Sequence, residues 1–318
     1  MNSLSMDKVN MFYDLIDEAC MLLYDEINLD YLNALIRVGN DIVFQIDDSK
    51  ITLDTYNKLK DIYANLNNKE FYSEEIRLAF ELLFVKAFKH AKMNLDLFTP
   101  DTICYLFSTI IKDKFEGMQI TILDTLLGTS NLLQAIANNI NDEVNLVGIE
   151  NNLNLVKLSE ISSNLQNNEI KIYFQDALNS VFDQAEVVIG DLEGTEYKGK
   201  VDLELSKKGV TYFPYLVIEK RLENIKDYGY FMYVIDNDFF NKKGINDLKD
   251  VLKNKATLMA LITLPSSIVQ ENHPGKSILI GKKEVLDDYN ISVLSIDSFE
   301  RSQLEDVFVR LEKLVREI

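Results

Sequence analysis

Residues 119 to 133 read Gln119-Ile-Thr-Ile-Leu-Asp-Thr-Leu-Leu-Gly-Thr-Ser-Asn-Leu-Leu133. An apolar, β-branched run ends at Asp124, small residues form a turn at Gly128, Thr129 and Ser130, and an apolar-periodic segment follows. This order predicts a strand, a glycine-bearing turn and a helix. Such a unit builds the crevice at the carboxyl end of a parallel sheet, where nucleotide-like ligands bind.

The residues after position 95 continue to alternate between strand-like and helix-like patterns. Near-continuous apolar strands of this kind are typical of a parallel sheet that helices cover on both faces. The last two strands are joined by residues 266–275, which carry no helical pattern, so we expect an antiparallel hairpin at one edge. A further strand at 291–296 and a helix at 299–317 end the sequence. The seven main strands are predicted at residues 119–124, 145–150, 171–176, 186–191, 229–236, 257–265 and 276–282.

Residues 1–95 have a different pattern, in which apolar side chains recur every three or four positions, as in helices that pack one face on a core. Ser73 is predicted to cap the last of these helices, with Glu74 and Glu75 in its first turn. We therefore expect an N-terminal helical domain at residues 1–95 and an α/β domain at residues 96–318. The four helices are predicted at residues 6–24, 29–44, 51–66 and 73–92.

The composition favours a globular, cytoplasmic protein. The chain has 318 residues, of which 47% are hydrophobic and 26% are charged. Its two cysteines, Cys20 and Cys104, offer no disulfide framework, which fits a reducing compartment. The sequence shows no leader and no apolar run near the ~18 residues that a membrane span needs. We expect no membrane partner, and the sequence leaves the oligomeric state open.

The net charge of −18 argues against nucleic acid as a partner. Residues 198–283 nevertheless carry 15 Lys and Arg against 10 Asp and Glu. These bases are either scattered over a solvated surface or form a lobe that meets phosphates. In the second case the segment gives salt-sensitive, non-specific contact with nucleic acid.

Other chemistries find little support in the sequence. His90 and His273 stand far apart, without cysteines or acids at metal-ligand spacing, so we expect no metal site. The glycine-rich loop of phosphate-binding ATPases and the serine elbow of hydrolases are both missing. The aromatic run at residues 212–215 is either core or the mouth of a cleft that follows the fourth strand.

Four carboxylates, Asp124, Glu150, Asp176 and Asp191, stand at the predicted ends of four successive strands. Each alone could cap the next helix, but four in order indicate a ligand-binding sheet edge. An acidic rim suits S-adenosylmethionine (SAM), which carries a sulfonium and an ammonium. Seven strands ending in a hairpin indicate a Rossmann-like class I SAM-dependent methyltransferase, and disfavour an NAD-dependent oxidoreductase.

Residues 93–283 resemble the N6-adenine-specific DNA methylase-like proteins, and within them the bacterial YtxK-like group. Phe98-Thr99-Pro100 is similar to the family's aromatic-Thr-Pro element, and residues 124–133 are similar to its Asp-Pro-x-x-Gly-Thr-Gly-x-Leu-Leu motif. Residues 262–265 and 276–280 resemble its closing hairpin. The resemblance implies SAM as cofactor, with Glu150 on the ribose hydroxyls and Asp176 on the adenine amine. The implied cofactor-binding residues are Phe98, Thr99, Pro100, Asp124, Gly128, Thr129, Ser130, Asn131, Glu150, Asn151, Asp176 and Ala177.

The chain departs from this family at its turn and at its catalytic motif. Thr125 replaces proline, and Ser130 replaces a glycine, which costs on the order of 1 kcal/mol or more if that position needs a positive φ. Relatives that methylate amines carry Asn/Asp/Ser-Pro-Pro-aromatic where this chain has Asp191-Leu-Glu-Gly. The implied catalytic residues are Asp191, which keeps the hydrogen-bond acceptor, Glu193, and Tyr197 as the nearest aromatic. N6-adenine methylation of DNA, methylation of another acceptor, and a SAM-binding or lapsed interaction protein all stay open.

Overall fold

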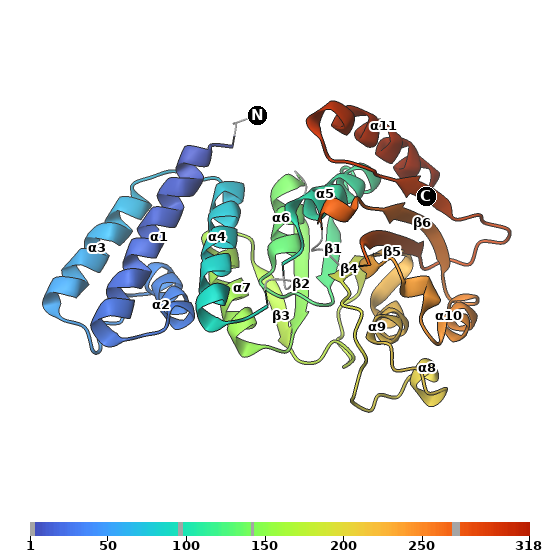
Figure 1. The fold of residues 1–318 in the computed structure, drawn as a ribbon, viewed down its shortest axis with the longest axis horizontal. Helices are drawn as coiled ribbons and strands as arrows, with labels where there is room; N and C mark the ends of the chain where they lie inside the picture. The colour runs from blue at the N-terminus through green and yellow to red at the C-terminus, as the bar shows by residue number, and fades with distance from the viewer. Residues whose placement is uncertain (1–3, 95–97, 141–142, 269–273) are drawn as a thin grey trace. The chain divides into compact units, whose positions relative to one another are not determined.

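The computed structural model describes residues 4–94, 98–140, 143–268 and 274–318. The chain separates into two compact units, whose elements are labelled in Figure 1. The helical unit comprises Met1–Thr99, Gly128–Asn138 and Asn152–Ile170, and the sheet unit comprises Pro100–Leu127, Asn139–Asn151 and Lys171–Ile318. Two segments beyond residue 95 thus pack with the N-terminal helices. The domain boundary between residues 95 and 96 stays a prediction.

The helical unit is built on the four helices that the sequence predicts, with small shifts at their ends. Asp30 and Thr52 cap the second and third, since their side chains accept the N–H groups of Asn33 and Thr55 at 3.1 and 3.3 Å. The apolar stripes of these helices form one buried core, to which a later helix contributes Leu158. The helices of the unit are α1 (Met6–Ile27), α2 (Tyr31–Val43), α3 (Leu53–Asn67), α4 (Ser73–Ala91), α6 (Asn131–Asn139) and α7 (Leu153–Leu165).

The predicted cap of α4 is wrong. The N-cap is Tyr72, whose backbone N–H donates to the fully buried carboxylate of Glu75 at 2.9 Å. Because Ser73 already lies in the first helical turn, its hydroxyl points elsewhere and donates to the carbonyl of Gln166 at 2.8 Å. Glu75, which the sequence placed in the first turn, therefore does the capping through its side chain.

The sheet unit contains one eight-stranded sheet in the order β3-β2-β1-β4-β5-β7-β6-β8. The pairs of β1 with β2 and β4, and of β4 with β5, are parallel, whereas β7 is antiparallel to both β5 and β6. The expected α/β class and closing hairpin are confirmed. The strands are β1 (Ile120–Asp124), β2 (Val144–Glu150), β3 (Ile170–Phe174), β4 (Ala185–Asp191), β5 (Ile225–Asp236), β6 (Thr257–Thr263), β7 (Lys276–Lys282) and β8 (Ser292–Ser295).

The sheet has eight strands rather than seven, because β8 pairs in parallel with β6. The sequence predicted the hairpin of β6 and β7 at the edge of the sheet. It lies one strand inside the edge instead, because β8 is outermost. Figure 1 shows α8, α9 and α10 on one side of these strands, and α5 and α11 on the other. The helices of the unit are α5 (Asp101–Lys114), α8 (Glu204–Lys207), α9 (Phe213–Arg221), α10 (Ile245–Leu252) and α11 (Arg301–Glu317).

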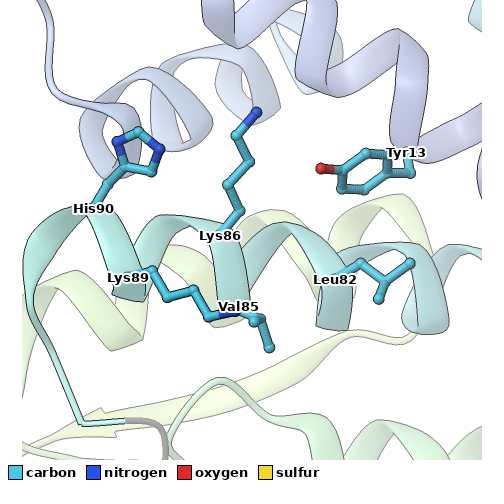
Figure 2. A pocket seen from close by; sticks show the side chains of 6 residues that line it. All are labelled: Tyr13, Leu82, Val85, Lys86, Lys89 and His90. Atoms are coloured by element: carbon cyan, nitrogen blue, oxygen red, sulfur yellow. The ribbon is translucent and has the colours of Figure 1, made fainter.

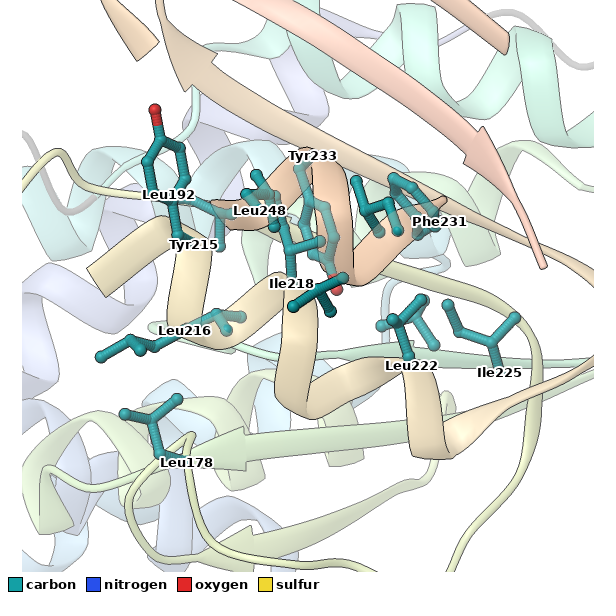
Figure 3. Close-up of a cluster of buried hydrophobic side chains, with 14 of the residues drawn as sticks. Leu178, Leu192, Tyr215, Leu216, Ile218, Leu222, Ile225, Phe231, Tyr233 and Leu248 are labelled. Carbon is teal, nitrogen blue, oxygen red and sulfur yellow. The ribbon is translucent and has the colours of Figure 1, made fainter. Parts of the chain in front are cut away.

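The core of the sheet unit lies between its central strands and α9 (Figure 3). Phe231 and Tyr233 of β5 lie in one buried cluster with Leu216 and Ile218 of α9. Apolar burial of this extent contributes roughly 1.5–3 kcal/mol for each large side chain. The cluster therefore fixes the strand ends on which the candidate site depends. Within the described residues, no helix combines the length and the apolar character that crossing a membrane would require.

Candidate functional site

The predicted acids lie at or near the carboxyl ends of their strands. Asp124, Glu150 and Asp191 are the last residues of β1, β2 and β4. The third strand ends two residues before Asp176, because the Asp176 carboxylate accepts the N–H of Leu178 at 2.8 Å and starts a turn. Strand order reverses at β1, with β2 on one side and β4 on the other. This is the topological switch point at which open α/β sheets bind ligands.

Asp124 is the most buried of these acids, with 1% of its surface exposed. Its side chain accepts the N–H of Leu126 at 3.0 Å. Burial raises the pKa of Asp124 to about 7; the Leu126 N–H opposes the shift, and the carboxylates of Asp191 and Glu150 add to it. A buried carboxyl beside two other acids favours a cation at this sheet edge.

A cavity of about 320 Å³ opens beside the end of β2 and the segments that follow β3 and β4. This volume is at the lower end of the roughly 300–1,000 Å³ typical of ligand sites. Acids and amides alternate around it with apolar and aromatic side chains. The lining residues are Leu126, Ile149, Glu150, Asn151, Gln175, Asp176, Ala177, Thr195, Glu196, Tyr197, Lys198 and Phe213.

The cavity unites five of the residues singled out from the sequence, namely Glu150, Asn151, Asp176, Ala177 and Tyr197. The Tyr197 hydroxyl lies 3.4 Å from a carboxylate oxygen of Asp176. Burial, and then the Asp176 charge, raise the pKa of Tyr197, so the hydroxyl stays protonated and donates.

Phe213 forms a wall of this cavity, although the sequence did not single it out from its aromatic run. Its ring stacks on that of Tyr197, with centroids 6.1 Å apart and planes 21° apart. The sequence indicated that the aromatic run at residues 212–215 is either core or the mouth of a cleft. Both interpretations are correct for part of the run. Tyr212 and Tyr215 are core, with 3% and 0% of their surface exposed, whereas Phe213 faces the cavity.

The segment after β4 is held by backbone hydrogen bonds. Leu192 donates to the carbonyl of Val234 at 2.9 Å, and Tyr197 donates to the carbonyl of Thr211 at 2.7 Å. Glu193 is exposed. A Cβ atom added at Gly194 would lie 2.3 Å from a carboxylate oxygen of Asp236, so a side chain here would require that carboxylate to move. Glycine thus lets the segment pass close to the end of β5.

The carboxylate of Asp191 forms an ion pair with Lys276, the first residue of β7. The ammonium nitrogen lies 2.6 Å from Oδ1, and both side chains are about 15% exposed. Lys276 reaches Asp191 because β5 lies between β4 and β7 and places their ends side by side. The residue expected to accept a hydrogen bond from a methyl acceptor therefore already binds a cation of the protein itself.

The turn after β1 shows the strain that the sequence indicated. Gly128 and Ser130 both have a positive φ, 56° and 64°. The Ser130 hydroxyl donates to the carbonyl of Thr129 at 2.6 Å, and Ser159 donates to the carbonyl of Gly128 at 2.8 Å. A serine in the left-handed region costs on the order of 1 kcal/mol relative to the glycine of the relatives.

The other predicted cofactor contacts in the helical unit belong to its packing. Phe98 lies against Phe88, with ring centroids 5.0 Å apart. The Asn131 side chain accepts a hydrogen bond from the buried Arg77 guanidinium at 2.7 Å and donates to the carbonyl of Thr99 at 3.4 Å. Pro100, the first residue of the sheet unit, is the N-cap of α5. Whether these residues also touch a cofactor stays a prediction.

The helical unit has a second cavity, of about 340 Å³, against α4 (Figure 2). Its walls are Leu82, Val85, Lys86, Lys89 and His90 from α4, together with Tyr13 from α1. The ammonium of Lys86 pairs with Asp17 at 2.6 Å. This cavity lacks the grouped strand-end acids of the first one, which is therefore the better candidate site.

Acids within reach neutralise many lysines of residues 198–283. Lys226 pairs with Glu186 at 2.5 Å, and Lys255 pairs with Glu204 at 3.0 Å. This pairing removes much of the positive charge that the composition indicates. The other lysines of the segment that form ion pairs are Lys207, Lys208, Lys220, Lys242, Lys276 and Lys282.

Several known proteins resemble this chain in structure. A putative class I SAM-dependent methyltransferase from Listeria monocytogenes matches with a TM-score of 0.84 and 23% identity, over 98% of this chain and 100% of the other. A type I restriction-modification methyltransferase subunit from Streptococcus thermophilus matches with a TM-score of 0.63 and 10% identity, over 96% and 93% of the two chains. At such identities these matches show the fold, which is that of class I methyltransferases.

The sequence itself matches one family. Residues 10–88 fit the model of the YtxK N-terminal helical domain. The uncharacterized protein YtxK of Bacillus subtilis (strain 168) is 33% identical over 273 residues, which cover 82% of each chain. This chain therefore belongs to the YtxK-like family, whose fold here combines a helical N-terminal region with a class I methyltransferase sheet.

Proposed function

We propose that the sheet unit binds SAM, with the adenosine part in the cavity between Glu150 and Asp176. The observation that carries the proposal is the meeting of these two acids in one cavity. A carboxylate at Glu150 can accept both ribose hydroxyls, and one at Asp176 can accept the exocyclic amine of adenine. Leu126 and Ile149 supply apolar walls for the base.

The charge of the site fits the same cofactor. When bound, SAM supplies a methyl group on a positively charged sulfur. Asp124 and Asp191 end the two strands at the switch point, and a bound cation would favour the ionised form of the buried Asp124 carboxyl.

The activity that we propose is SAM-dependent methyl transfer to an amino group. In this reaction Asp191 holds the acceptor amine and orients it, and no covalent intermediate forms on the protein. Tyr197 and Phe213 present stacked rings beside the same segment. The type I restriction-modification subunit with this fold makes nucleic acid the first acceptor to test.

A second function is favoured by the ion pair between Lys276 and Asp191. Because the ammonium occupies the carboxylate at 2.6 Å, an acceptor amine has to displace it. A protein that binds SAM without turnover, and acts through its surfaces, needs no such displacement. The neutralised lysines of residues 198–283 also weaken the case for nucleic acid as acceptor.

Calorimetric titration with SAM and with S-adenosylhomocysteine tests the cofactor site. Glu150→Ala and Asp176→Ala should each remove most of the affinity, since each leaves donors of the ligand without an acceptor. Glu305→Ala, at an exposed acid of α11, is the control and should bind as the wild type does. Unchanged affinity in both cavity variants would refute the site.

Transfer of a labelled methyl group separates the two functions. The wild type is incubated with labelled SAM and with DNA, RNA or cell extract, and Asp191→Ala serves as the inactive control. Label that appears with the wild type and disappears with Asp191→Ala supports the enzyme. Tight SAM binding without any transfer supports the binding protein.

A further inference from the structure

A groove of about 620 Å³ lies at the far edge of the sheet, between α10, β6 and the segment that leads into β8. Its floor is apolar, because Leu258 and Leu261 of β6 face it, and Leu261 is paired with Val293 of β8. The other residues that line it are Phe240, Lys249, Leu252, Lys253, Ala256, Thr257, Val285, Leu286, Tyr289, Asn290 and Ile291. We call this surface the edge groove.

Three aliphatic side chains around the edge groove are exposed to solvent. Val293 is 65% exposed, Val285 51% and Ile291 40%. Exposed apolar side chains that border one groove mark an interaction surface rather than ordinary scatter. The face of β8 that carries Val293 is therefore exposed to solvent. It lies on the same side of the sheet as α10.

Charges of both signs lie at or next to the edge groove. Lys249 and Lys253 line it on the α10 side, and Asp287 and Asp288 stand between two residues of the other wall, Leu286 and Tyr289. All four are exposed, and among the residues that the structure describes none of them forms an ion pair. When two copies of such a surface meet about a twofold axis, the basic border of each copy faces the acidic border of the other. The two apolar centres then lie against each other.

We propose that the edge groove binds the edge groove of a second copy of this chain, giving a twofold dimer. Val293 and Val285 of each copy fill the apolar centre of the other. Lys253 of one copy faces Asp287 of its partner, and the reverse contact follows from the symmetry. The interface is independent of the SAM site, so the two proposals can fail separately.

The contact uses the face of β8 rather than its backbone edge. Arg310 of α11 donates to the carbonyl of Ser295 at 2.8 Å, at the end of the outermost strand. A charged side chain on an edge carbonyl discourages a further strand from pairing there. Side-chain packing over the groove remains available, since Val293 lies on that side of the strand.

The experiment is sedimentation equilibrium of the full chain and of two valine variants. Val293→Glu places a charge in the apolar centre, whereas Val309→Glu adds the same charge on α11 at a valine of equal exposure, 66%. We expect a wild-type dimer and an unchanged dimer for Val309→Glu. For Val293→Glu we expect a dissociation constant at least roughly tenfold higher, equivalent to about 1.4 kcal/mol.

A charge exchange makes the test specific for this geometry. Lys253→Glu and Asp287→Lys should each weaken the dimer, and the double variant should regain it, because the ion pairs re-form with reversed sign. Three results would overturn the proposal: a monomeric wild type at high protein concentration, equal dimers for Val293→Glu and wild type, or a double variant as weak as its singles. A monomer would leave the groove to a different protein.

Discussion

Replacing Asp124 by asparagine should stabilise the unliganded protein above neutral pH while weakening SAM binding. The side chain is fully buried and its carboxyl has a pKa of about 7, mainly because burial disfavours the charge. Asparagine has nearly the same shape and keeps an oxygen that can accept the N–H of Leu126. It carries no charge at any pH, so the cost of a buried anion disappears.

The size and sign of this effect follow from proton linkage. The pKa of Asp124 is about 7 in the folded state, against an ordinary value of 3.8, so the folded state holds the proton more tightly than the unfolded state. Stability is therefore lost as pH rises from about 4 to 7, and the loss is complete above 7. At 1.36 kcal/mol per unit the full loss is about 4 kcal/mol, of which about 2 to 3 kcal/mol falls between pH 5 and pH 8.

Urea unfolding at pH 5 and at pH 8, followed by circular dichroism because the chain has no tryptophan, measures this difference. Asp124→Asn should have a higher free energy of unfolding than the wild type, and this difference should be about 2 to 3 kcal/mol larger at pH 8 than at pH 5. If both proteins show the same pH dependence, the charged carboxyl is not penalised and the reasoning fails. Calorimetry in two buffers should further show that SAM binding to the wild type releases protons near pH 7, because a bound cation favours the ionised carboxylate.

Three other substitutions test the turn, the ion pair and the segment after β4. Ser130→Gly should raise the unfolding free energy by about 1 kcal/mol in urea, since glycine adopts a positive φ without strain; no gain would show that the turn is relaxed. Lys276→Met should raise transfer of a labelled methyl group roughly tenfold, because the Asp191 carboxylate loses its ammonium partner, whereas Lys276→Arg keeps the pair; equal rates would show that the pair does not restrain the acceptor. Gly194→Ala should weaken SAM binding by about 1 kcal/mol in calorimetry, because the new Cβ displaces either the Asp236 carboxylate or the segment itself; wild-type affinity would mean that the segment does not shape the cavity.

Local patterns predicted the fold well because most central strands contain an apolar run that ends at a polar residue. Asp124, Glu150 and Asp191 mark the true ends of their strands. Asp176 was placed in a strand because its turn is made by its own side chain, a contact that the apolar pattern does not record. The eighth strand was predicted as an element, but its pairing with β6 depends on tertiary contact.

The candidate site was predictable only where its residues follow strand ends. The ion pair between Asp191 and Lys276 joins residues 85 positions apart, and it arises from the order of β4, β5 and β7 in the sheet. No spacing rule in the sequence could have shown it. Phe213 belongs to the aromatic run that the sequence indicated. Its place at the start of α9 determines that this ring, rather than those of Tyr212 and Tyr215, lines the cavity.

Thr125 makes a contact that the proline of the family motif could not make. Its backbone N–H and its hydroxyl both donate to the carbonyl of Ile189 at 2.9 Å, which ties the end of β1 to β4. Proline, the residue of the relatives, can supply neither donor. Replacing Thr125 alone by proline would remove both hydrogen bonds that join the two strand ends, so a proline here requires compensating changes in neighbouring residues.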